Sequence, residues 1–204
     1  MSGRHFAPDS EQPDSFVFSD ETMALAEAVI AKYPPGRQQS ACIPLLDLAQ
    51  RQHGWLPKAA IRAVAELLKM PEVRAFEVAT FYTMFNIAPV GKHLVQVCRT
   101  TPCWLRGSDD LTNACRKHLD VELGETSADG EFTLVEVECL GACVNAPMVQ
   151  INDDYYEDLD AERMVGLLDD LKAGKPVSIG SQEPERETSA PIGGRTTLLA
   201  GDEA

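Results

Sequence analysis

The sequence predicts an α+β fold in which a helical N-terminal part precedes a smaller domain of strands and helices. Apolar residues recur at helical spacing between residues 19 and 89, whereas short segments with β-type alternation appear after residue 89. Beyond residue 175, Gly, Pro, Ser and Glu dominate and no periodicity remains. We therefore predict four parts: a flexible arm at 1–18, a helical domain at 19–89, an α/β domain at 90–175 and an extended tail at 176–204.

Four short helices are predicted in the N-terminal part. The first follows Ser19, a residue type that caps helix N-termini, and stops before the Pro-Pro-Gly sequence at 34–36. A second apolar pattern covers residues 43–54 and ends at a glycine. Pro57 and Pro71 open the third and fourth helices, because proline suits the first position of a helix.

Strands and helices alternate in the second predicted domain. Segments rich in Val, Leu and Ile predict strands, and amphipathic patterns predict helices. The expected order is a strand at 93–97, a helix near 107–118, strands at 132–137 and 148–151, a turn into a further strand at 155–156 and a last helix from 160 to 174. This order indicates a small α/β layer domain.

The charge and hydropathy of the chain exclude several classes of function. Its 204 residues carry a formal net charge of −14, from 32 acidic and 18 basic residues, which argues against binding nucleic acid or an anionic membrane. No run of roughly 18 apolar residues could span a bilayer, and the first ten residues lack the apolar core of a secretory signal. We therefore expect a reducing cytoplasm, where six cysteines suit metal or redox chemistry better than disulfides.

Four of the cysteines form two closely spaced pairs. Cys98 and Cys103 have four residues between them, and Cys139 and Cys143 have three. Each pair directly follows a predicted strand, so neighbouring strands could bring the two loops together. Loops of this kind, with Gly141 and Pro102, can direct backbone N–H groups at a compact inorganic core.

The spacing of these pairs favours an iron–sulfur cluster over zinc. Structural zinc sites most often use pairs separated by two residues, whereas a [2Fe–2S] cluster has two irons that each take two thiolates. A zinc-stabilised docking module without redox chemistry remains the alternative. A thioredoxin-type thiol–disulfide motif would require C-x-x-C, which the chain lacks. Cys42 and Cys115 have no such partner spacing and are expected to be small buried apolar residues.

Three segments together resemble a known family. They are Val78-Ala-Thr-Phe-Tyr-Thr-Met-Phe85, Cys98-Arg-Thr-Thr-Pro-Cys-Trp-Leu-Arg-Gly107 and Glu138-Cys-Leu-Gly-Ala-Cys-Val-Asn-Ala-Pro-Met-Val-Gln-Ile-Asn152. Over roughly residues 16–175 the chain is similar to the 24-kDa (E) subunits of proton-translocating NADH:quinone oxidoreductase, respiratory complex I. The resemblance implies a helical N-terminal bundle followed by a thioredoxin-like domain that holds one [2Fe–2S] cluster. In such domains a cis-proline often precedes a strand, which makes Pro147 a candidate.

The resemblance also implies a function and partners. Cys98, Cys103, Cys139 and Cys143 would be the cluster ligands, and the chain would transfer electrons as a subunit of the NADH-oxidising module. NADH and FMN would bind to a neighbouring flavoprotein subunit, and this chain would have no complete active site and no catalytic residue of its own. Other peripheral-arm subunits would be further partners, on the cytoplasmic side of the inner membrane. The corresponding diaphorase subunit of an NAD-linked hydrogenase or formate dehydrogenase is the alternative within the family.

Overall fold

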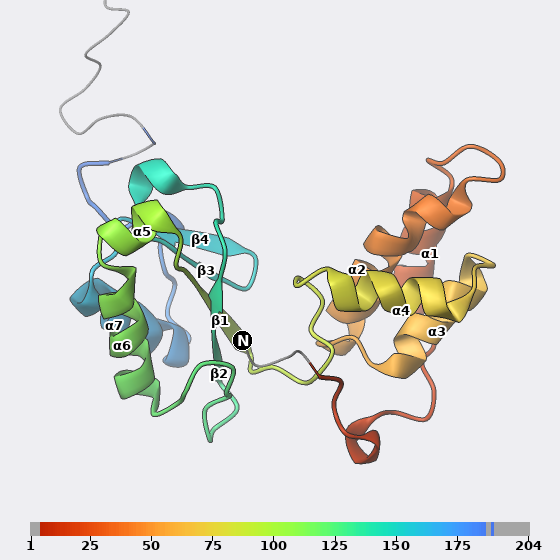
Figure 1. Cartoon of the computed structure of the whole chain (residues 1–204), viewed down its shortest axis with the longest axis horizontal. Coiled ribbons are helices and arrows are strands. Elements are labelled where there is room, and N and C mark those ends of the chain that lie inside the picture. The colour runs from red at the N-terminus through yellow and green to blue at the C-terminus, as the bar shows by residue number, and fades with distance from the viewer. Residues whose placement is uncertain (1–4, 187–188, 190–204) are drawn as a thin grey trace, which may run out of the picture. The chain divides into compact units, whose positions relative to one another are not determined.

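The computed structural model describes residues 5–186 and 189, which divide into two compact units between Val90 and Gly91 (Figure 1). The first unit is helical, and the second combines helices with a five-stranded sheet. The predicted α+β fold is therefore confirmed. None of the helices in the described part is long and apolar enough to cross a membrane.

Helices make up the regular structure described in the first unit. Their bounds are η1 (Asp9–Glu11), α1 (Asp20–Ile30), η2 (Gln38–Ala41), α2 (Cys42–His53), α3 (Lys58–Leu67) and α4 (Glu72–Phe81). Ser19 caps α1 as predicted, because its hydroxyl oxygen accepts a hydrogen bond of 3.1 Å from the backbone N–H of Thr22. Pro57 and Pro71 stand at the N-cap positions of α3 and α4, whereas the prediction placed them at the first helical position. Their ψ angles of 159° and 133° are extended, so the helices begin at the next residue.

The core of the first unit lies between α2, α3 and the helices beside them. One face of α2 and one face of α3 are fully buried: Leu45, Leu46 and Ala49 from α2, and Ala60, Ile61, Val64 and Ala65 from α3. Residues predicted as a flexible arm contact this core. Ala7 and Phe18 are buried, and the ring of Phe6 packs edge-on against Phe76 at a centroid distance of 5.8 Å. Isolated apolar residues in a segment with prolines have no periodicity, so the sequence did not indicate this packing.

A mixed sheet with helices forms the second unit. Its elements are β1 (His93–Cys98), α5 (Thr101–Leu105), α6 (Ser108–Leu119), β2 (Phe132–Val137), η3 (Cys143–Asn145), β3 (Val149–Ile151), β4 (Asp154–Glu157), α7 (Ala161–Lys172) and β5 (Gly180–Ser181). The strand order is β2-β1-β3-β4-β5; β1 pairs in parallel with β2 and β4 with β5, while β3 is antiparallel to both β1 and β4. Helix α6 contacts α7, β1 and β2 (Figure 1), and buried residues of both helices join the core of the sheet.

The predicted elements of this unit are present with small shifts in their bounds. Asp160 caps α7, since its carboxylate accepts a hydrogen bond of 2.8 Å from the backbone N–H of Arg163. The sequence analysis missed α5 and β5. Helix α5 has five residues and β5 has two, too few for either period to be recognised. Strand β5 adds residues 180 and 181, from the segment predicted as a tail, to the sheet.

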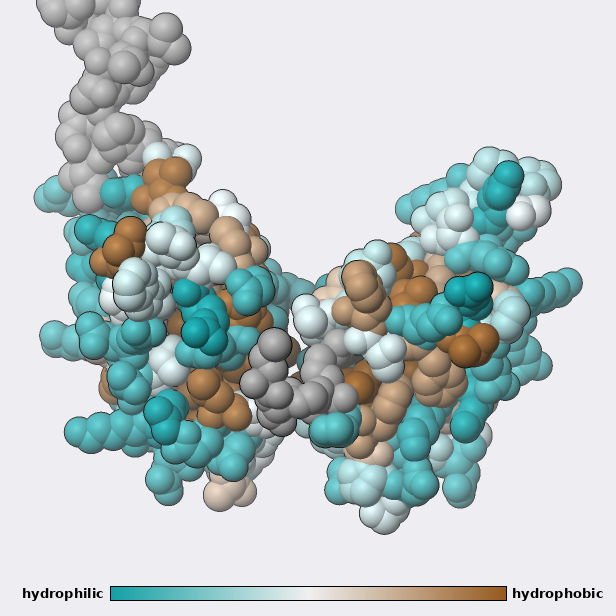
Figure 2. All heavy atoms as spheres, in the orientation of Figure 1, coloured by the Kyte–Doolittle hydropathy of each residue, from teal (hydrophilic) through white to brown (hydrophobic). Residues whose placement is uncertain are grey.

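The surface is mostly hydrophilic in the view of Figure 2, with hydrophobic patches on both units. Large apolar side chains with more than half of their surface exposed occur in both. In the first unit they include Val73 and Phe81 of α4, and in the second they include Trp104, Leu105 and Val144 around the cysteine-containing segments. Patches of this kind often mark contacts with other proteins.

Candidate iron–sulfur site

The parallel pairing of β1 with β2 brings the two cysteine segments to one edge of the sheet. In the register of this pair, Cys98 at the end of β1 lies opposite Val137 at the end of β2. The chain after each strand therefore emerges on the same side. Cys103 follows on α5, while Cys139 comes two residues after β2 and Cys143 begins η3. The sequence analysis expected both pairs in loops, but Cys103 and Cys143 belong to short helices.

The two pairs differ in exposure to solvent. Cys98 and Cys103 are each only 1% exposed and pack with Ala146 and Met148 in a small cluster of buried residues. Cys139 and Cys143 are exposed, and their Sγ atoms are 3.5 Å apart. The site thus has an inner, protected pair and an outer pair that faces solvent in this chain.

Hydrogen bonds and charge interactions connect the four thiols. Within the inner pair, Cys98 raises the pKa of the Cys103 thiol and Cys103 lowers that of Cys98. The hydroxyl of Thr100 lies 3.5 Å from Cys98 Sγ and lowers the pKa of both Cys98 and Cys139, so it acts on one thiol of each pair. The charge of Cys143 acts on Cys103, and that of Cys98 acts on both outer cysteines. The structure therefore places all four residues predicted as ligands at the same edge of the sheet.

Each pair contains one thiol with a lowered pKa and one with a raised pKa. Burial raises the pKa of Cys98, but hydrogen bonds from the Thr100 hydroxyl and the Leu140 N–H outweigh it, so the net shift is downward. Burial, with the hydrogen bond to Cys98, raises the pKa of Cys103 to about 12. In the outer pair, the Gly141 N–H lowers the pKa of Cys139. The hydrogen bond to Cys139 raises the pKa of Cys143, because a thiol that donates a proton keeps it.

Backbone groups around the thiols favour negative charge on sulfur. The Leu140 N–H lowers the pKa of Cys98, and the Gly141 N–H lowers that of Cys139. The Met148 N–H acts in the same direction on Cys103. Gly141 has a φ of +91°, a left-handed conformation that glycine adopts without steric cost. The loop is held from outside by the Tyr155 hydroxyl, which donates a hydrogen bond of 2.8 Å to the Leu140 carbonyl oxygen. Such N–H groups stabilise thiolates and tune bound clusters.

Some contributors to the site were missed in the sequence. Thr100 lies between the first two cysteines, and its position inside that motif was the available signal. Tyr155 is remote in sequence and had no signal. Pro147, the candidate cis-proline, is preceded by a cis peptide bond in the structure. Cys42 and Cys115 are buried away from the site, as predicted.

The donor set fits a two-iron cluster. The four thiols stand as two pairs that follow the ends of the parallel strands β1 and β2, and each iron of a [2Fe–2S] cluster takes two thiolates. A thioredoxin-type mixed sheet with two thiol pairs at one edge defines a class of proteins that can bind an iron–sulfur cluster.

Comparison with known proteins agrees with this class. A model of the thioredoxin-like [2Fe–2S] ferredoxin family matches residues 26–172. The chain belongs to that family, whose cofactor is a [2Fe–2S] cluster, and this confirms the predicted resemblance and cofactor.

Curated relatives extend the likeness over most of the chain. The E subunit of the NADH-quinone oxidoreductase of Rickettsia bellii is 59% identical over 159 residues, which cover 78% of this chain and 95% of that protein. The corresponding protein of Rickettsia conorii is 61% identical over the same shares. NADH dehydrogenase [ubiquinone] flavoprotein 2 of Dictyostelium discoideum, a mitochondrial protein, is 50% identical over 192 residues, which cover 94% of this chain and 77% of that protein.

A solved structure of an NAD⁺-reducing [NiFe]-hydrogenase shares the fold. It superposes with a TM-score of 0.57 at 22% identity, covering 65% of this chain and 23% of the hydrogenase chain. At that identity the likeness concerns the fold alone.

Proposed function

We propose that this chain is the electron-transfer subunit of the NADH-oxidising module of a proton-translocating NADH:quinone oxidoreductase, with Cys98, Cys103, Cys139 and Cys143 as ligands of its [2Fe–2S] cluster. The observation that carries the proposal is the meeting of two thiol pairs at the shared end of β1 and β2. Relatives about 60% identical over most of the chain, which are named as the E subunits of NADH-quinone oxidoreductases, support the assembly.

The residues of this chain would hold the cluster and set its surroundings. When bound, the cluster supplies reversible uptake and release of one electron. Burial of Cys98 and Cys103 excludes water from one side. The Thr100 hydroxyl and the Gly141 N–H direct positive dipoles at sulfur, which favours the added negative charge.

The outer pair gives electrons a short route to a partner. Cys139 and Cys143 are exposed, and apolar Trp104, Leu105 and Val144 are exposed in the segments around the thiols. We propose that a flavoprotein subunit, which would bind FMN and NADH, covers this side. A peripheral position on the cytoplasmic side of the inner membrane follows from that assembly.

The domain boundaries belong to the same proposal. Residues 90–175 would form the body of the cluster domain, and the helical domain at 19–89 would contribute contacts with other subunits. Exposed Val73 and Phe81 on α4 support a contact surface on the helical domain. The arm at 1–18 and the tail at 176–204 would flank these domains.

The NAD-linked hydrogenase alternative has weaker support. Its evidence is the shared fold at 22% identity, whereas the quinone-linked relatives reach 59% identity over a larger share of the chain. Purification of the native assembly would decide, because quinone-reductase subunits and hydrogenase subunits copurify in different complexes.

Metal analysis tests the ligand assignment. The full chain, purified anaerobically, should contain about two irons and two acid-labile sulfides and give an EPR signal after dithionite reduction. Serine at any of the four ligand positions should alter that signal, while Cys42→Ala should leave it unchanged. A colourless protein with one zinc per chain would overturn the proposal.

A further inference from the structure

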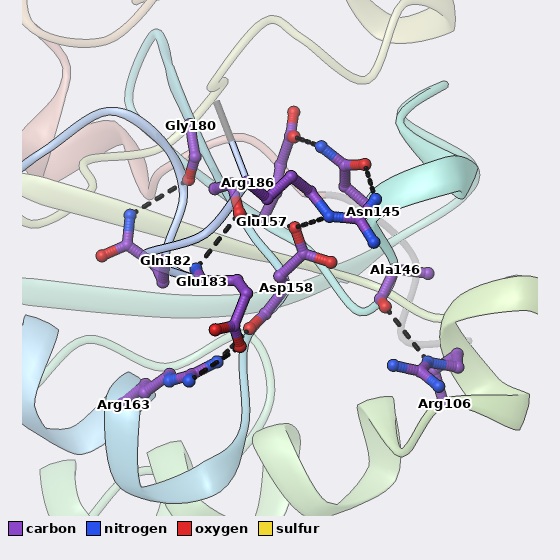
Figure 3. Close-up of polar contacts among 11 residues, drawn as sticks. Arg106, Asn145, Ala146, Glu157, Asp158, Arg163, Gly180, Gln182, Glu183 and Arg186 are labelled. Carbon is purple, nitrogen blue, oxygen red and sulfur yellow. Dashed lines mark hydrogen bonds and ion pairs between the residues drawn. The ribbon is translucent and has the colours of Figure 1, made fainter. Parts of the chain in front are cut away.

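Residues 180–186, near the start of the C-terminal segment that follows residue 175, fold back toward the outer thiol pair. Strand β5 pairs with β4, and the next residue, Gln182, donates its backbone N–H to the carbonyl oxygen of Glu157 at 2.9 Å. A turn then follows, closed by a hydrogen bond of 3.0 Å from the Arg186 N–H to the Glu183 carbonyl oxygen. This turn places the Arg186 side chain beside Asn145, at the end of η3 (Figure 3). Helix η3 begins with Cys143.

Arg186 contacts two side chains that are distant in sequence. Its Nη1 donates a hydrogen bond of 2.7 Å to Asn145 Oδ1, and its Nε lies 3.3 Å from Asp158 Oδ2 in an ion pair. The side chains of Arg186 and Asp158 are only 15% and 11% exposed. Solvent therefore screens this ion pair less than a surface pair, and loss of one partner would leave a charge poorly compensated.

Asn145 is held at every polar group of its side chain and backbone. It is 4% exposed, its Oδ1 accepts from Arg186, and its Nδ2 donates to Glu157 Oε2 at 2.6 Å. Its carbonyl oxygen accepts from the Asp158 N–H at 2.8 Å, and its own N–H donates to the Ala142 carbonyl oxygen at 3.1 Å. Asn145 therefore ties the short helix that begins with Cys143 to the turn after β4.

A three-residue helix cannot hold its own position. One turn has too few internal hydrogen bonds to offset the entropy of ordering it. The hydrogen bonds of Asn145 provide the stabilisation that η3 lacks, and Arg186 is the charged donor among its partners. Hydrogen bonds to charged groups are the stronger kind, and a buried acceptor left without its donor is costly.

We propose that Arg186 is a positioning residue for Cys143: through Asn145 and Asp158 it holds η3 in place and so stabilises the outer side of the cluster. This inference rests on the proposed function, since it takes Cys143 as a ligand. It assigns a role to the beginning of the C-terminal segment, outside the matched range 26–172 of the family model.

Arg163 offers a matched control. Its Nη2 donates a hydrogen bond of 3.0 Å to Glu183 Oε2, and its Nη1 donates one of 3.1 Å to the carbonyl oxygen of Asp158. It therefore holds the same C-terminal turn and contacts the same aspartate as Arg186 (Figure 3). The described contacts of Arg163 do not include Asn145, so its loss tests the turn without removing the contact to η3.

The experiment compares Arg186→Gln, Arg186→Lys and Arg163→Gln in the full chain with its cluster bound. The rate of cluster loss to an iron chelator is followed by bleaching, the EPR line shape is recorded, and hydrogen exchange is measured at the amides of 143–146. Arg186→Gln should lose its cluster about tenfold faster than the unmodified chain, because a charged hydrogen bond and its ion pair are removed. Its EPR line shape should change, and exchange at 143–146 should accelerate.

The two other variants separate positioning from general stability. Arg186→Lys keeps the charge but not the forked geometry, so its rate should be intermediate, about threefold faster than unmodified. Arg163→Gln should stay within about twofold of the unmodified chain in cluster loss, even where its melting temperature falls. If Arg186→Gln does not fold, the lysine variant carries the same test.

Either of two results would overturn the positioning role. One is that Arg186→Gln matches the unmodified chain in its rate of cluster loss and in its EPR line shape. If Arg186→Gln does not fold, the same result for Arg186→Lys would overturn the role. The other is an equal change in Arg163→Gln. An unmodified chain without iron and sulfide would instead defeat the proposed function, so the two failures are distinguishable.

Discussion

Removal of the Thr100 hydroxyl should lower the reduction potential of the cluster. Thr100 Oγ1 lies 3.5 Å from Cys98 Sγ and also lowers the pKa of Cys139, so it acts on one cysteine of each pair. A thiolate can only accept, so the hydroxyl donates to sulfur when the cluster is bound. Reduction adds negative charge that this dipole stabilises, and Thr100→Val removes the dipole while nearly preserving the shape of the side chain.

The expected shift can be estimated from the worth of a hydrogen bond. If a hydrogen bond favours the reduced state by about 1 kcal/mol, it raises the reduction potential by about 40 mV. The conversion rests on about 59 mV for each tenfold change in the equilibrium constant of a one-electron couple. Thr100 has one hydroxyl proton and can donate it fully to only one sulfur, so Thr100→Val should lower the potential by about 40 mV.

A redox titration followed by EPR of the reduced cluster measures this shift. Thr100→Ser retains the hydroxyl and should stay close to the unmodified potential. Thr101→Val, at the exposed neighbouring residue, controls for the added apolar surface. A potential for Thr100→Val that stays within about 10 mV of the unmodified chain, or rises, would refute the reasoning.

Three further predictions concern stability. Burial raises the pKa of Cys115 from 9.0 to about 12, so the unfolded chain releases this proton first and stability should fall above pH 9. Cys115→Ala should reduce that fall by about 1 kcal/mol between pH 9 and 10, in urea titrations at each pH. Leu134 is fully buried in the sheet core, so Leu134→Ala should cost about 3 kcal/mol of unfolding free energy, and a cost near zero in denaturant unfolding would contradict the described packing. Ser19→Ala removes the cap of α1 and should cost about 1 kcal/mol, with Ser19→Asp as the control that keeps an acceptor.

Local patterns were sufficient to predict most elements of the fold. The strand at Phe132–Val137 and the helix capped by Asp160 were recognisable because their spacing repeats within a few residues. Helix α5 and strand β5 were missed because each is too short for its period to repeat. The packing of Phe18 was missed for a related reason, since a single apolar residue carries no period.

At the site, too, local sequence predicted some features of the thiol pairs and the tertiary structure decided others. That Cys98 and Cys139 follow strands was readable from the chain, and so was the preference of two pairs for a two-iron cluster. Their meeting depends on the parallel pairing of β1 with β2, which joins segments more than thirty residues apart. The connections made by Thr100 and Arg186 depend on that pairing and on the path of the chain after β4.

The sequence by itself determined the chemistry available to this protein: four thiols in two pairs, each directly after a strand, on a chain too acidic to favour nucleic acid. Only the tertiary structure decided that Cys98 and Cys103 are protected while Cys139 and Cys143 face solvent. The physical reason is the range of the interactions. Donor types and helix or strand periods are local properties, whereas burial and hydrogen bonds between distant segments arise only when the whole sheet and its helices pack together.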